Sequence, residues 1–336
     1  MSELFFLESE PHSLAPLLFR LQPAGDAQDR ENLASYLKRL ARMHRMSPRG
    51  LVEEYVSLPE PSKDAVALQR DWLHRNAQDL IGAGDRAGEL ADWFERNAGV
   101  AGLRNCTLVN LSRFASGQKL VTRVSRVCLE CFADDTRASR PMFERLQWRL
   151  EAVTACDRHR CALVKPLCLN LRECSRLAIP NLPGICTHCG SVGLTCSASS
   201  AGGEVSETEI WVAQQCRRLI EALPHLAAAD PVRMKRNLRA HWLARDGIVS
   251  AAKATGMVQS SISAWLSKPR AKCSLFRLID IALTQELDLV AMLQGEIVAR
   301  ASPADRSPRT HKRVLLSNPT PRAGQVSLKK RGCATR

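Results

Sequence analysis

Aromatic residues make up only 5% of this chain, and no stretch approaches the roughly 18 consecutive apolar residues of a membrane-spanning helix. Residues with β-branched side chains are few beside leucine, alanine and arginine, which favours helices over strands. The first residues, Met1 to Glu10, are acidic with a short apolar run, unlike a secretory signal. We therefore expect a mainly helical, cytoplasmic protein that contacts no membrane.

Common catalytic signatures are also missing from the sequence. There is no Gly-x-x-x-x-Gly-Lys-Ser/Thr phosphate loop and no His-Glu-x-x-His metalloprotease helix. No histidine is followed two residues later by glutamate, as in the zinc deaminases. We predict no catalytic residues and no enzyme activity.

Cysteine, by contrast, is abundant and concentrated in one part of the chain. Of the 13 cysteines, ten lie between Cys106 and Cys196. In a reducing compartment such a cluster indicates metal ligands rather than disulfides. The three remaining cysteines, Cys216, Cys273 and Cys333, are scattered, and we interpret them as small structural or tail residues.

A first zinc site is predicted from two ligand pairs with two residues between the partners of each pair. A tight turn of this length places both donor atoms on one side of a metal ion. The four donors leave no open position for water, so the site is expected to be structural. Asp134 and Asp135 follow the first cysteine pair directly, and we interpret them as solvated acids and not as metal ligands. The predicted ligands are Cys128, Cys131, Cys156 and His159.

A second zinc site begins from Cys186 and Cys189, which repeat the same spacing. The other two ligands must come from Cys161, Cys168, Cys174 or Cys196. We prefer Cys168 and Cys174, because they follow the first site directly, where a second ribbon-like knuckle would begin. His188, inside the Cys186–Cys189 turn, could replace one of the cysteines, although it is expected to point outward.

Helices are expected on both sides of this region. Before it, we predict helices within residues 29–56, with a boundary at Ser47-Pro48, and over 65–80 and 88–97. The segment 141–150 should form a short helix or strand over the first metal. Residues 197–203 suit a flexible joint, and a helix should run from Glu207 to Leu223, ended by Pro224.

The C-terminal helical part contains a segment, residues 251–266, with the pattern of a helix-turn-helix. Small Ala252 permits close contact between the helices, Gly256 supplies the turn, and Ile262 packs the second helix back. If that second helix enters a major groove, side chains on it face the bases and nearby cations face phosphates. The predicted DNA contacts are Gln259, Ser260, Ser261 and Ser263, with Lys253, Lys268 and Arg270 near phosphates.

Positive charge is concentrated at the end of the chain. The formal net charge is +14, and between Arg300 and Arg336 the only acid among many Lys and Arg residues is Asp305. Such a tail suits a polyanion, although a solubilising disordered end is the alternative. The predicted organisation is a helical region (1–127), a zinc-binding region with small zinc-ribbon-like elements (128–196), a helical domain (207–299) and a basic disordered tail (300–336).

The order of these motifs resembles the TniQ family of transposition proteins. The similarity lies in residues 128–135, 146–153 and 156–163, with an upstream helical segment at 31–41. Relatives usually have a closer cysteine pair where this chain has Cys168 and Cys174, and a proline where it has Leu129 and Asp157.

The resemblance implies a non-catalytic adaptor that binds DNA, helps to define a target site and recruits an AAA+ ATPase. A transposase, a guide-RNA complex or a second copy of the chain are further candidate partners, near the bacterial nucleoid. The alternative function is a zinc-stabilised helix-turn-helix transcription regulator, which would bind its operator alone. A zinc hydrolase is disfavoured, because both predicted metal sites are saturated by protein ligands.

Overall fold

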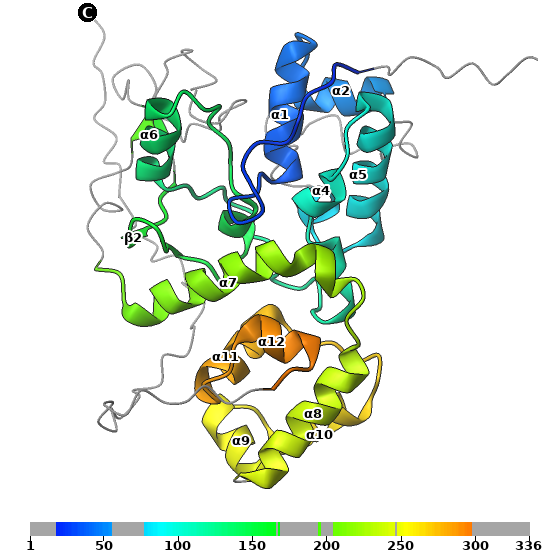
Figure 1. The fold of residues 1–336 in the computed structure, drawn as a ribbon, viewed down its shortest axis with the longest axis vertical. Helices are drawn as coiled ribbons and strands as arrows, with labels where there is room; N and C mark the ends of the chain where they lie inside the picture. Colours follow the sequence, from blue (N-terminus) through cyan, green and yellow to red (C-terminus); the bar gives the residue numbers. More distant parts are fainter. Residues whose placement is uncertain are drawn as a thin grey trace, which may run out of the picture. The chain divides into compact units, whose positions relative to one another are not determined.

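The computed structural model describes residues 18–55, 77–165, 167–168, 194–195, 204–245 and 247–297 (Figure 1). The chain divides into a compact unit over 1–299 and a second over 300–336, and the basic tail lies outside the described residues. Among the described residues, no helix has both the length and the apolar character needed to cross a membrane.

Helices dominate the described part of the chain, so the prediction of a mainly α protein is confirmed. The N-terminal half contains α1 (Leu33–Met43), α2 (Pro48–Tyr55), α4 (Ala77–Ile81), α5 (Asp85–Ala98), α6 (Leu129–Arg137) and the short 3-10 helices η2 (Leu103–Cys106), η3 (Val109–Arg113) and η4 (Leu146–Arg149). The C-terminal half contains α7 (Glu207–Leu226), α8 (Pro231–Ala244), α9 (Gly247–Thr255), α10 (Gln259–Ser267), α11 (Leu275–Thr284) and α12 (Leu289–Gln294).

The first helices follow their sequence signals closely. Asn32 caps α1 by accepting a hydrogen bond from the backbone N–H of Ser35 at 2.9 Å. Helix α2 begins at Pro48, where a missing backbone N–H costs no helical hydrogen bond. The expected helix over 65–80 lies mostly outside the described residues, and α4 covers its end.

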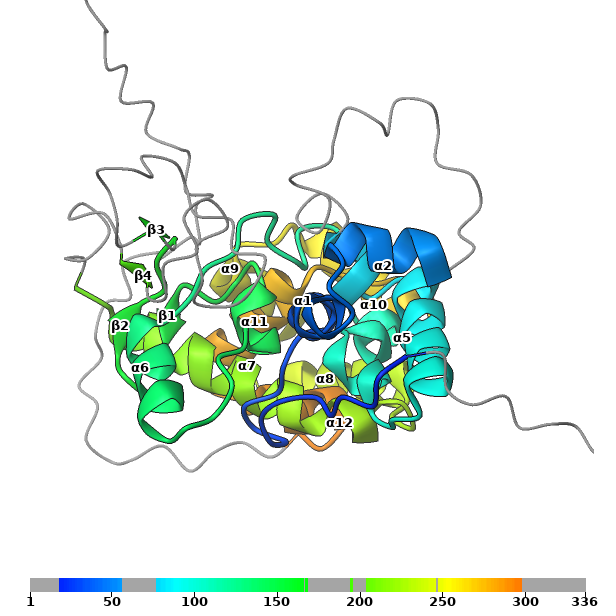
Figure 2. The same cartoon turned by 90° about the horizontal axis from the view of Figure 1, so that it is seen from above.

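Two very small antiparallel pairs are the only strands among the described residues. Strand β1 (Ala155–Cys156) pairs with β2 (Cys161–Ala162), with Cys156 opposite Cys161. Strand β3 (Leu167–Cys168) pairs with β4 (Leu194–Thr195). Figure 2 shows α6 beside the β1–β2 pair, which is the arrangement that brings the two halves of the first cysteine cluster together.

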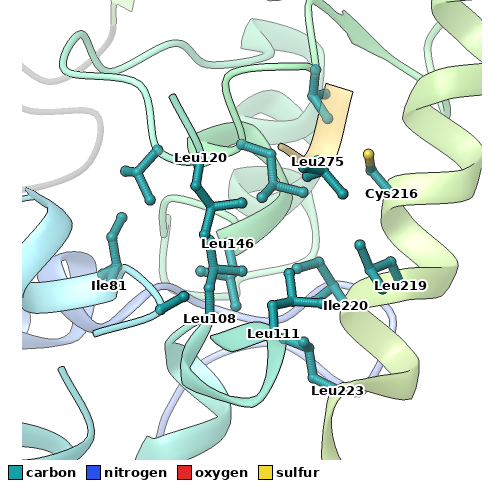
Figure 3. Close-up of a cluster of buried hydrophobic side chains, with 14 of the residues drawn as sticks. Ile81, Leu108, Leu111, Leu120, Leu146, Cys216, Leu219, Ile220, Leu223 and Leu275 are labelled. Carbon is teal, nitrogen blue, oxygen red and sulfur yellow. The ribbon is translucent and has the colours of Figure 1, made fainter. Parts of the chain in front are cut away.

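Helix α7 is buried along most of its length by residues from both halves of the chain. Cys216, Leu219, Ile220 and Leu223 pack with leucines of the preceding segment and with Leu275 of α11 (Figure 3). The helix runs three residues beyond the end expected at Leu223, because a proline in the last turn removes a single hydrogen bond and the turn closes past it.

Polar contacts fix α7 on both sides. On one side, the Gln147 side chain donates to the carbonyl of Ala213 at 2.8 Å, and Arg217 pairs with Asp157 at 2.7 Å. On the other, the buried Gln215 side chain accepts from the backbone N–H of Leu289, at the start of α12. Residues 147–157 and residues 275–293 therefore both pack against helix α7.

Helices α8 to α12 lie beside one another (Figures 1 and 2). Between α9 and α10 the chain turns at Gly256, whose φ of +64° is one that side chains disfavour. The N–H of Met257 bonds back to the carbonyl of Ala252, which closes α9 as glycine-ended helices commonly close. Ile262 of α10 is fully buried, as its place in the pattern predicts.

Candidate metal centre

Four donor side chains meet at the end of α6 that faces the β1–β2 pair. Cys128 is the N-cap of α6 and Cys131 lies in its first turn, while Cys156 ends β1 and His159 lies in the turn that follows. The backbone N–H of Cys131 points at the sulfur of Cys128, 3.4 Å away. The unpaired N–H groups of a helix N-terminus favour negative charge, so this position suits thiolates.

The distances between these donors can be compared with those around a zinc ion. With Zn–S near 2.3 Å and Zn–N near 2.0–2.1 Å, a tetrahedron has edges of about 3.6–3.8 Å. The Cys131 and Cys156 sulfurs are 3.7 Å apart, and Nδ1 of His159 lies 3.3–3.6 Å from all three sulfurs. All four ligand atoms lie within 4.8 Å of one another. The residues therefore fit one tetrahedral ion.

Three of the four donors are buried and the histidine is partly exposed. The Cys131 and Cys156 thiols donate hydrogen bonds that lower the pKa of Cys128, while the bond to Cys128 raises the pKa of Cys131. A metal ion bound here would take the place of these shared protons, because its ligands must be thiolates. The four-donor set leaves no open coordination position, which is the arrangement of structural zinc sites.

Asp134 is a member of this centre that the sequence interpretation missed. Its Oδ2 lies 2.9 Å from Nε2 of His159, so the carboxylate fixes the ring with Nδ1 toward the sulfurs. Burial alone would raise the pKa of Asp134, but the hydrogen bond from His159 and the charges of Arg137 and Arg158 lower it. The signal was the three-residue step from Cys131 to Asp134, which shares one face of a helix.

The reading of Asp135 as a solvated acid is wrong. Asp135 is fully buried and forms a two-pronged ion pair with Arg145, at 2.8 and 3.0 Å. Arg145 also binds Asp29 at 2.7 and 3.0 Å and lies over the ring of Trp148. Burial alone would lower the pKa of Arg145, but its bonds to Asp29 and Asp135 raise it. The pair ties α6, and hence Cys128 and Cys131, to the N-terminal segment.

A fifth thiol, that of Cys161, lies beside the donor set. Its sulfur is 3.6 Å from that of Cys128, and burial raises the pKa of Cys161 to about 12. Cys161 does not belong to the group of four, so we interpret it as a neighbour of the site and not as a ligand.

The predicted second site cannot be compared with the structure. The backbone of Cys168 is in β3, whereas its side chain and Cys174, Cys186, His188 and Cys189 lie outside the described residues. The joint predicted at 197–203 also lies outside them.

The predicted DNA-contact residues surround the α9–α10 pair. Lys253, Gln259, Ser260, Ser261, Lys268 and Arg270 are exposed and Ser263 is half-buried. Trp265 and Ile262 form the buried face of α10. The contacts themselves stay a prediction.

The fold and the site define a helical protein whose central region carries a cluster of four donor side chains that could hold a metal ion. The model of the TniQ family matches residues 25–163, a range that includes Cys128, Cys131, Cys156 and His159. The chain therefore carries a TniQ domain, the resemblance predicted from the sequence is confirmed, and the match indicates a transposition-associated protein. No curated protein that was compared matches the chain.

Proposed function

We propose that this protein is a non-catalytic accessory factor of DNA transposition, which helps to select the target site and recruits an AAA+ ATPase and the transposase. The observation that carries the proposal is the TniQ match over residues 25–163, which contains all four donors of the metal centre. The ion at this centre is zinc, because three thiolates and one imidazole at tetrahedral distances are its preferred set. It stabilises the fold and performs no chemistry.

Helices α9 and α10 are the DNA-reading unit in this proposal. The close turn at Gly256 and the buried Ala252 and Ile262 suit a helix-turn-helix, with α10 as the recognition helix. Its exposed polar side chains suit base edges, and Lys253, Lys268 and Arg270 suit phosphates. Cys168, Cys174, Cys186 and Cys189 remain the proposed second zinc set, and the four-part division of the chain remains part of the proposal.

Partner dependence is the experiment that tests this function. The purified protein is incubated with duplex DNA, with and without the AAA+ ATPase of the same element and ATP, and protection of the DNA is mapped. An adaptor should give stable, ATP-dependent protection only with the ATPase, and should retain the ATPase on an affinity column. Full protection of one short operator by the protein alone would instead show the alternative transcription regulator.

A further inference from the structure

Helix α8 presents two exposed arginines outside its buried face. Met234, Leu238 and Trp242 are buried in the core, whereas Arg236 and Arg239 are exposed. Within the described part of the chain neither arginine forms an ion pair. Exposed arginines of this kind often form only a solvated surface, so a binding role depends on which residues lie beside them.

The buried Lys235 shows which segment packs beside helix α8. Its Nζ donates to the carbonyls of Lys268, Pro269 and Ala271 at 2.7, 3.2 and 2.7 Å, and the residue as a whole is 3% exposed. The ammonium also lies 5.6 Å from the centre of the Trp265 ring. Lys235 therefore packs α8 against the loop that follows α10, with its charge at the negative end of that helix.

Helical geometry then places the arginines relative to that loop. Arg239 is one turn beyond Lys235, about 40° round the helix, with Cβ atoms about 5–6 Å apart. Arg236 precedes Arg239 by three residues and shares its exposed face. Because Lys235 bonds to the carbonyls of Lys268, Pro269 and Ala271, Arg239 lies on the side of α8 nearer this loop, and Arg236 lies about 60° further round the helix.

Four exposed cations lie on these two segments, which Lys235 holds together, and we name them the α8 edge: Arg236, Arg239, Lys268 and Arg270. No carboxylate among the described residues forms an ion pair with any of them. Unneutralised arginines suit phosphate oxygens, which their planar groups bind in pairs. The edge continues from the C-terminal end of α10, so a duplex that holds α10 in its groove brings a flanking phosphate strand close to it.

We propose that the α8 edge binds the phosphate backbone of duplex DNA beside the groove that α10 enters. This inference rests on the proposed DNA-binding role of α10 and adds a second contact, from a helix outside the helix-turn-helix pair. The edge carries no sequence information and fixes the register of α10 on the duplex.

The test is the salt dependence of DNA binding by the full chain, measured with the AAA+ ATPase and ATP present, because stable binding is expected only then. Each neutralised phosphate contributes about 0.9 to the slope of log K against log salt concentration. The double variant Arg236→Ala/Arg239→Ala should lower this slope by about 1.8 relative to wild type, measured by anisotropy of a labelled duplex between about 50 and 200 mM salt. The control variant Arg86→Ala/Arg96→Ala removes two exposed arginines of α5 and should leave the slope unchanged. An unchanged slope in the α8 variant, with a wild-type circular dichroism spectrum, overturns the inference.

A second pair of variants separates this inference from the proposed function. Gln259→Ala/Ser260→Ala should reduce discrimination between duplex sequences and leave the slope near the wild-type value. If Gln259→Ala/Ser260→Ala loses sequence discrimination while Arg236→Ala/Arg239→Ala has the wild-type salt slope, the α8 edge does not bind phosphates and the DNA-binding role of α10 stands. If the wild type binds no duplex with or without the ATPase, the proposed function fails. Tighter binding to duplex RNA of equal length, with the same slope loss, overturns the assignment to DNA.

Discussion

Replacing Asp134 by alanine should weaken zinc binding at the centre about tenfold. The carboxylate accepts from Nε2 of His159 at 2.9 Å, and loss of such a partner typically lowers metal affinity about 10- to 100-fold. Asp134 is 22% exposed, so water can replace part of the lost bond, which places the expected effect at the lower end. A neutral acceptor supports about half of a charge-assisted bond, so Asp134→Asn should lose only about threefold.

The assay is competition for zinc with a chromogenic chelator of known affinity, followed by thermal melting in excess zinc. The control is Arg137→Ala/Arg158→Ala, which removes the cations around Asp134 and leaves its hydrogen bond to His159 in place. This control should bind zinc nearly as wild type does. The reasoning is refuted if Asp134→Ala holds zinc within twofold of wild type, or if the control loses as much affinity as the alanine variant.

Four further expectations can be measured on the same protein. Cys156→Ser should lower the zinc content by one equivalent relative to wild type in elemental analysis and lower the melting temperature, because metal binding and folding are linked; an unchanged zinc content would contradict the ligand set. Leu219→Ala, in the fully buried face of α7, should lower the free energy of unfolding by about 2–5 kcal/mol in urea, against near zero for an exposed alanine substitution. Burial alone would raise the pKa of Glu209, but hydrogen bonds from the Ser206 N–H, the Ser206 hydroxyl and Thr154 lower it overall. The contribution of Glu209 to the stability of the fold is therefore complete above the unfolded pKa near 4.3 and is lost as the pH falls through the lower folded pKa. The melting temperature of Glu209→Gln should vary less with pH in this range than that of wild type. Removing residues 300–336 should flatten the salt dependence of DNA binding, and an unchanged slope would make the tail a spacer.

The first metal centre could be predicted because its signal is local. A gap of two residues brings two donors together whether the chain forms a turn or, as at Cys128 and Cys131, the first turn of a helix. The expectation of a turn nevertheless hid the helix, and with it the partner of His159, since Asp134 shares a face with Cys131 only in a helix. The mainly helical class and the helices α9 and α10 could likewise be predicted from patterns of residues close together in the sequence.

Contacts between distant segments could not be predicted in the same way. Arg145 joins Asp29 and Asp135, and nothing in their spacing indicates that a buried arginine will pair with two acids. The two-sided burial of α7 also escaped the sequence, because an apolar stripe shows that a face is covered and not which segments cover it. Lys235 is similar, since a lysine is normally exposed and this one is buried by three carbonyls of a loop 33–36 residues away.

The shared helix α7 has a mechanical consequence. Gln147, Asp157 and Leu289 all bond to the same 20-residue helix, so a torque applied at one set of contacts reaches the other without a flexible joint between them. If α10 binds DNA as proposed, bending or twisting of the duplex would transmit load through α7 to the half of the protein that carries Cys128, Cys131, Cys156 and His159.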